Sequence, residues 1–317
     1  MALSKILPDS LKVTIATNPS DNKDGRLFYN TTTNRLSVQD GTNTEFASGG
    51  TLGSEVNPAS SAKALYDGGF TTDGAYYIKN IWTGNVAKQV YCEFNYNFRA
   101  LGTGYHLQKF DPADMQNTRY AAGASSSLTR LSSDLNDNTT YTWQFSTASS
   151  GAGAAHYHKT GTVLSDLGQF FIRFDMNRTS SGDSNAKGEA SIAFDSDNSG
   201  TASSLNSGYS YVAHFQEMTN TFNLMSVGYL MPSDTGTAAI DVDDIVCAYS
   251  NDQTTSIQEA RDRLEGTANS TLHGIPVYQH TGDFVTTGLY LDIIHQGWCD
   301  TGTPNTSQHM YWVAAEV

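Results

Sequence analysis

The chain is poor in charge, in cysteine and in long apolar runs. Charged residues make up 16% of its 317 residues, against about 25% in an average soluble domain. Its three cysteines, Cys92, Cys247 and Cys299, are too few and too far apart for a disulfide framework, and none has the CxxC spacing of a metal site. No segment approaches the roughly 20 apolar residues of a membrane span, and residues 1–8 contain no signal-peptide core. We therefore expect a chain made in a reducing cytosol, with free thiols and no membrane span.

Small polar residues and aromatics take the place of charge. The chain has 28 Gly, 17 Tyr, 14 Phe and 4 Trp, and its 38% hydrophobic content is enough for a core. With 32 acidic and 18 basic residues the net charge is −14, so a phosphate backbone or an anionic membrane is repelled on average. Nucleic acid is therefore not an expected partner.

Short apolar runs separated by turn residues predict a mainly β protein. Apolar residues alternate at 170–176, at 289–293 and at 310–317, which is typical of strands in a sheet with one buried face. A capped helix is predicted at 256–264 as a connector. The spacing is irregular and no fixed-period repeat occurs, so a β-sandwich or jelly roll is favoured for residues 111–317 over a propeller or β-helix.

Residues 1–50 form a separate small module in this interpretation. Residues 27–30 and 35–39 read as two strands of a hairpin, and the following residues 47–51 are small enough to be a linker. The segment DGRLFYNTTTNRLSVQDGTN resembles the short hairpin repeats of phage tail fibres and related virion proteins. An ordinary surface hairpin is the alternative. The resemblance implies a virion attachment module that buries its apolar face against copies of itself, and so a homotrimer.

Residues 53–94 resemble the opening of fibrinogen-like domains, and residues 51–110 are taken as that segment. The residues themselves predict a short helix at 61–66, then a hairpin of strands at 76–78 and 89–94. The sequence departs from the family pattern at Ala62, where a disulfide cysteine is usual, so Cys92 has lost its expected partner. The glycine-rich segment that should follow is also absent, and a complete fibrinogen-like domain is not implied. The matching residues are Asn57, Pro58, Leu65, Gly69, Asp73, Gly74, Tyr76, Ile78, Val90, Tyr91 and Cys92.

An acidic loop offers a candidate calcium site. Asp195, Asp197 and Ser199 place oxygen atoms at alternating positions before a glycine, a pattern that suits hard Ca²⁺. Asn206 stands where an EF-hand has its bidentate glutamate. A solvated Asx-type turn without metal is the alternative. No other cofactor is expected.

Two histidines at alternating positions are a second candidate metal site. His156 and His158 would share one face of a strand, but no third ligand is identifiable. A surface pair without metal is the favoured interpretation. His295 lies in an apolar run and is interpreted as a core residue.

The candidate ligand site lies in a predicted loop near the C-terminus. Trp298, Asp300 and Asn305 combine an aromatic ring with polar side chains, as sites for sugars do because a sugar has apolar ring faces and hydroxyl edges. The alternative is that Trp298 closes the end of a barrel.

Function is predicted to be binding, not catalysis. The sequence has no GxSxG elbow, no activated cysteine and no Walker or Rossmann glycine pattern. With the resemblances, this predicts a fibre or spike subunit of a tailed bacteriophage, made in the host cytoplasm and displayed on the virion. It would contact other virion proteins through its N-terminal region and bind a host-surface glycan or protein. A capsid decoration, cement or head-fibre protein is one alternative. A polysaccharide-degrading enzyme is another, because the distance between two catalytic carboxylates is set by the fold and cannot be read from the sequence.

Overall fold

The chain separates into two compact units, Met1–Asn57 and Pro58–Val317. Residues 58–110, predicted as part of a separate segment, therefore belong to the same unit as residues 111–317. No helix among the described residues is long and apolar enough to cross a membrane. The computed structural model describes residues 14–16, 26–30, 35–39, 51–98, 103–115, 118–123, 126–147, 154–179, 187–195, 211–217, 224–231, 239–240, 246–252, 284–285, 288–298 and 305–315, together with 261 and 265.

The first unit contains the predicted hairpin. Strand β2 (Arg26–Asn30) pairs antiparallel with β3 (Arg35–Gln39), so that Asn30 lies opposite Arg35. Strand β1 (Thr14–Ala16) adds to β2 in parallel. The hairpin prediction is confirmed.

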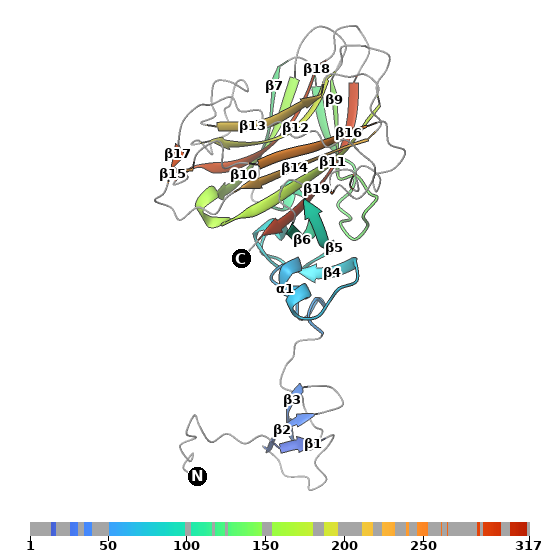
Figure 1. The fold of residues 1–317 in the computed structure, drawn as a ribbon, viewed down its shortest axis with the longest axis vertical. Coiled ribbons are helices and arrows are strands. Elements are labelled where there is room, and N and C mark those ends of the chain that lie inside the picture. Colours follow the sequence, from blue (N-terminus) through green and yellow to red (C-terminus); the bar gives the residue numbers. More distant parts are fainter. Residues whose placement is uncertain are drawn as a thin grey trace. The chain divides into compact units, whose positions relative to one another are not determined.

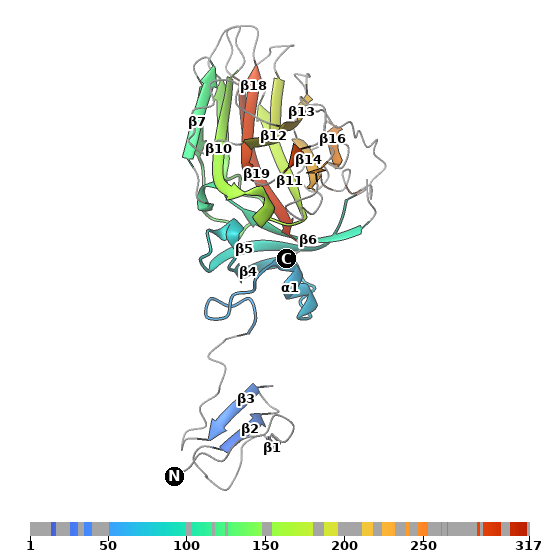
Figure 2. The same ribbon diagram turned by 90° about the vertical axis from the view of Figure 1, so that its left-hand side faces the viewer.

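The second unit is a β-sandwich of two antiparallel sheets (Figures 1 and 2), which confirms the predicted fold class. The five-stranded sheet has the order β13-β12-β18-β10-β7, and the nine-stranded sheet has the order β16-β14-β11-β19-β6-β5-β4, with β9 on β19 and β8 on β9. The five strands are β7 (Thr118–Gly123), β10 (Ala154–Val163), β12 (Lys187–Asp195), β13 (Tyr211–Glu217) and β18 (Tyr290–Trp298). The nine are β4 (Gly74–Ile78), β5 (Lys88–Phe98), β6 (Thr103–Phe110), β8 (Ser126–Arg130), β9 (Trp143–Thr147), β11 (Phe170–Thr179), β14 (Leu224–Met231), β16 (Val246–Asp252) and β19 (Asn305–Ala315). The other elements are α1 (Ala62–Asp67), the 3-10 turns η2 (Ile81–Thr83), η3 (Pro112–Asp114) and η4 (Leu164–Asp166), and the pair β15 (Ala239–Ile240) and β17 (Phe284–Val285).

The main core lies between the two sheets. Phe170, Ile172, Phe174 and Met176 of β11 all belong to it, because alternate residues of a strand point to the same face. Leu291 and Ile293 of β18 meet them from the other sheet. The predicted alternation is therefore confirmed, and adjacent Tyr311 and Trp312 of β19 fall into different clusters on opposite faces.

The outer face of β11 and β19 is buried too, so the expectation of a single buried face is wrong for these central strands. Phe171 on the outer face stacks with Tyr105 of β6 at 5.1 Å between ring centroids and contacts Phe98 of β5 at 4.8 Å. The ends of β5 and β6 thus cover the strand. Beside them, fully buried Arg173 and Asp175 form part of a charged network.

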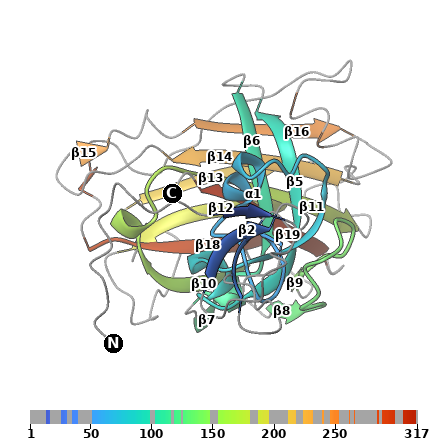
Figure 3. The same ribbon diagram turned by 90° about the horizontal axis from the view of Figure 1, so that it is seen from below.

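Residues 53–94 have the predicted local structure. The Ser61 hydroxyl accepts a 3.0 Å hydrogen bond from the Ala64 backbone N–H and so caps α1. Strands β4 and β5 then form the expected antiparallel hairpin, and α1 lies beside β5 and β6 (Figure 3). Cys92 is a free, buried thiol, as predicted, and burial raises the pKa of this thiol.

Candidate functional site

Side chains of the predicted ligand and calcium residues lie outside the described part of the chain, so both predictions stay predictions. The strands place Trp298 at the end of β18 and Asn305 at the start of β19, in different sheets. Among the described residues, no group of three or more His, Cys, Asp or Glu side chains could hold a metal ion. The backbone alone is described for Asp195, Trp298 and Asn305, and Asp197, Ser199 and Asp300 lie outside the described residues.

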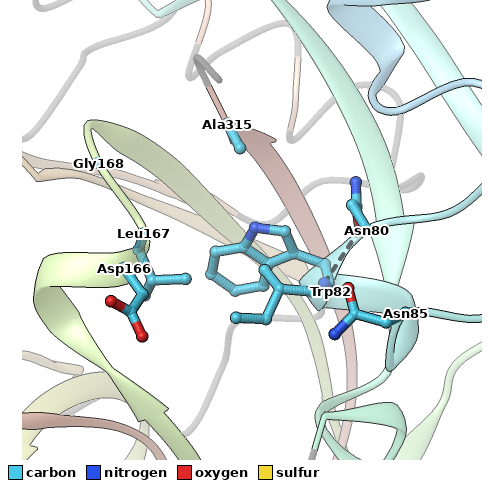
Figure 4. Close-up of a pocket in the computed structure, with 8 residues that line it drawn as sticks. Asn80, Trp82, Asn85, Asp166, Leu167, Gly168 and Ala315 are labelled. Atoms are coloured by element: carbon cyan, nitrogen blue, oxygen red, sulfur yellow. Dashed lines mark hydrogen bonds between the residues drawn. The ribbon is translucent and has the colours of Figure 1, made fainter.

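The described surface does contain a groove between turns η2 and η4, built of two adjoining compartments. The first, of about 400 Å³, is mainly apolar (Figure 4), and the second, of about 330 Å³, is mainly polar. They share Ile81, Asn85 and Asp166, so we treat them as one η2–η4 groove. The apolar compartment is completed by Asn80, Trp82, Leu167, Gly168 and Ala315, and the polar compartment by Gly84, Asp114, Gly161, Thr162 and Val163.

Turn η2 is fixed by a reciprocal cap. The Asn80 side chain accepts from the Trp82 N–H at 2.9 Å, and the Thr83 hydroxyl accepts from the Asn80 N–H at 3.0 Å. Gly84 ends the turn in the left-handed region at φ 67°. The Asn80 amide also donates to the side chain of Gln108 at 2.7 Å, which ties the turn to β6. The residues at the groove therefore rest on a rigid element.

Trp82 forms the floor of the apolar compartment. Its indole packs against Phe110 at 5.0 Å and Phe170 at 5.6 Å between ring centroids, and the residue is only 1% exposed. In Figure 4 the ring lies between Leu167 and Asp166 on one side and Asn80 on the other. Because the core holds the indole, the compartment is preformed.

The opposite wall follows an irregularity at the end of β10. The register with β18 shifts between Lys159 and Val163, where Gly161 has φ 69°. The Thr160 hydroxyl donates to the Leu291 carbonyl at 2.7 Å and accepts from the Thr162 N–H at 3.2 Å. These bonds hold the bend from which η4 carries the exposed Asp166 to the groove.

Asp114 forms the third wall, at the end of η3. This turn is capped by Asp111, which accepts from the Ala113 N–H at 2.9 Å and from the Trp143 indole N–H at 2.8 Å. The Asp114 side chain is 7% exposed, and its Oδ1 atom pairs with Lys88. A Cβ atom at Gly84 would overlap the Asp114 carbonyl oxygen, so the close approach of η2 and η3 requires glycine.

Sequence reasoning missed every residue of this groove. The cap signal Asn80-Ile81-Trp82-Thr83-Gly84 is visible locally and could have identified the first turn. Nothing local indicates that the η4 turn, far away in the sequence, faces it. The groove is a product of the tertiary fold.

A second cluster, the histidine column, lies inside the sandwich and consists of His158, His295 and His309. Ring centroids are 5.2 Å apart between His158 and His295 and 4.5 Å apart between His295 and His309. His156, beside the column, is also buried. The interpretation of His156 and His158 as a surface pair is therefore wrong, because alternation shows which side chains share a face but not whether solvent reaches it. The core interpretation of His295 is confirmed.

Burial favours the neutral form of two members of the column, His295 and His309. It lowers the pKa of His309 to about 3 and, with neighbouring histidines as a further cause, lowers the pKa of His295 well below its usual value. The Tyr311 hydroxyl and His295 Nε2 share a 2.8 Å hydrogen bond, and the Ser307 hydroxyl and His309 Nε2 share one of 2.7 Å.

Comparisons with known proteins give distant likenesses only. No family model matches the sequence, and no curated protein matches it. Among solved structures, the legume lectin-like domain from Entamoeba histolytica is 9% identical, with 66% of this chain and 94% of that chain covered and a TM-score of 0.35. The carbohydrate recognition domain of Emp47p is 7% identical, with 61% and 89% covered and a TM-score of 0.32. The binding domain of botulinum neurotoxin DC, solved with rat synaptotagmin II, is 10% identical, with 71% and 48% covered and a TM-score of 0.29. Identities and TM-scores this low carry no information on function.

Proposed function

We propose that this protein is a fibre or spike subunit of a tailed bacteriophage that binds a glycan of the host surface in its η2–η4 groove. The observation that carries the proposal is the pairing of an apolar and a polar compartment around Asn85 and Asp166. A sugar ring has an apolar face and a rim of hydroxyl groups, so it needs both surfaces side by side. Each compartment is within the roughly 300–1,000 Å³ of small-molecule sites.

The rigidity of the groove also supports binding. Trp82 is held by the core and Asn80 by its cap, so little conformational freedom is lost when a ligand enters. Asn85 and Asp166 are exposed side chains with amide and carboxylate groups, which exchange hydrogen bonds with hydroxyl groups readily.

The virion role rests on the N-terminal part of the chain. The hairpin segment that resembles tail-fibre repeats falls within a compact unit of its own, Met1–Asn57. In this proposal that unit attaches the subunit to other virion proteins and to copies of itself in a homotrimer, and the β-sandwich faces the host. Labelling of intact particles with an antibody, together with the mass of the purified protein in dilute solution, tests location and assembly. A stable monomer would contradict the trimer.

The test of the groove compares binding of full-length variants to host cells. Asp166→Ala and Asn85→Gly remove exposed groups, and glycine suits position 85 because Asn85 has φ 59°. Both should weaken cell binding at least tenfold while the melting temperature changes little, because exposed substitutions cost within about 0.5 kcal/mol. Asp67→Ala is the matched control, since Asp67 is an exposed carboxylate of α1 outside the groove.

Two results would contradict the proposal. Binding of both variants at the parental level would show that the groove is not the binding site. No binding of the intact protein to host cells would favour the capsid decoration role. Trp82→Ala is unsuitable as a test, because loss of a core indole costs about 3–5 kcal/mol and confounds binding with folding.

A further inference from the structure

The polar compartment carries carboxylates but no cationic side chain. Asp114 and Asp166 both line it, whereas no Lys, Arg or His lines either compartment in the part of the chain that the structure describes. The charged side chains that line the groove are therefore all carboxylates.

Asp114 is the more buried of the two carboxylates. Its side chain is only 7% exposed, and Oδ1 pairs with Lys88 and lies 3.6 Å from an Arg130 nitrogen. Oδ2 is buried and has no hydrogen-bond partner among the described residues. A buried carboxylate oxygen without a donor is costly, so the described cations satisfy the Asp114 carboxylate only in part.

The neighbouring cations are already engaged. Lys88 pairs with Asp114, and Arg130 pairs with Asp111 at 2.6 Å. Moving either one to a ligand carboxylate would break a pair with an aspartate that is at least nine-tenths buried. An acidic ligand would thus find neither Lys88 nor Arg130 free to pair with it, and it would also face the negative charge of Asp166.

From these observations we infer that the groove selects uncharged saccharides and rejects acidic ones such as sialylated or uronic-acid sugars. The inference rests on the proposed glycan-binding function and adds the chemical class of the ligand. Hydroxyl groups donate to the exposed Asp166 carboxylate, the sugar's apolar face lies against the compartment floored by Trp82, and a sugar carboxylate would face the like charge of Asp166.

Matched oligosaccharides test this selection. Neutral hexose oligosaccharides and the corresponding uronic-acid oligosaccharides are titrated into the full-length protein by calorimetry at about 20 mM and 150 mM salt. The acidic member should bind about tenfold more weakly, the size expected for like charges several ångströms apart near a protein surface. The gap should narrow at the higher salt concentration, because salt screens exposed charges.

Asp166→Asn gives the second arm, because it removes one charge and keeps the side chain's size. This variant should narrow the difference between the neutral and acidic oligosaccharides, whereas the control Asp67→Asn should leave it unchanged. Equal or tighter binding of the acidic sugars by the parent protein, or an unchanged difference in Asp166→Asn, would overturn the inference while the proposed function stands. Binding of no saccharide in any arm would overturn both.

Discussion

Acid should destabilise this protein through the histidine column well before its carboxylates are protonated. His295 and His309 are fully buried, and burial lowers both pKa values, that of His309 to about 3. In the unfolded chain the same side chains titrate near 6.5. Below that pH the unfolded state binds protons that the folded state does not, so the free energy of unfolding falls as pH falls.

The magnitude follows from proton linkage. Each such histidine contributes about 1.4 kcal/mol per pH unit once the pH is well below 6.5. Two of them therefore remove about 4 kcal/mol between pH 7 and pH 5, a large part of the roughly 5–15 kcal/mol stability of a typical domain. Burial raises the pKa of Asp111, which acts in the opposite direction, but this effect is common to the parent and the variants below.

The assay is urea unfolding of the parent and of His295→Gln and His309→Gln at pH 7, 6 and 5. Each variant should lose about half of the parent's pH dependence, because glutamine does not titrate. His106→Gln is the control: His106 is partly exposed and stacks on Tyr66 outside the column, so this variant should keep most of the pH dependence. The reasoning is refuted if His309→Gln has the same pH dependence as the parent.

Three further predictions concern stability and reactivity. Arg261→Met should cost about 3–5 kcal/mol in urea unfolding, because the Arg261 guanidinium bonds the buried Asp175 carboxylate at 2.9 Å; a loss below about 1 kcal/mol would contradict this. Gly84→Ala should cost about 2–5 kcal/mol from overlap with the η3 carbonyl and from its left-handed backbone, whereas Gly69→Ala, with φ 92° and open space around it, should cost only about 1–2 kcal/mol. Iodoacetamide should label Cys92 only after denaturation, as followed by peptide mass spectrometry, and rapid labelling of the native protein would show that the thiol is accessible.

The sequence predicted those parts of the fold whose signals are local. The N-terminal hairpin, the capped helix α1 and the alternation of β11 each depend on a few neighbouring residues, and each is found. Which strand faces are covered by other strands could not be predicted in the same way. Phe171 looks like a solvent-facing residue by alternation, but it is buried because Tyr105 and Phe98 fold over it from other strands.

The candidate site shows the same limit. Trp298 has a sequence signal, because it lies among polar residues in a predicted loop. Trp82 lies in a short turn whose cap is recognisable from the sequence but whose partner η4 is not. Asp166 reaches the groove because β10 bends at Gly161, and no pattern in the sequence couples that bend to η2. Candidate ligand residues that come together from separate elements can be identified only from the structure.

The most direct test of the central claim is hydrogen–deuterium exchange of the full-length protein with and without a saturating host-surface oligosaccharide. The η2–η4 groove predicts slower exchange for peptides that cover residues 80–86 and 161–168, and unchanged exchange for α1. Protection confined to peptides around Trp298, at the end of β18, would place the binding site in the C-terminal loop and would contradict the assignment of the groove.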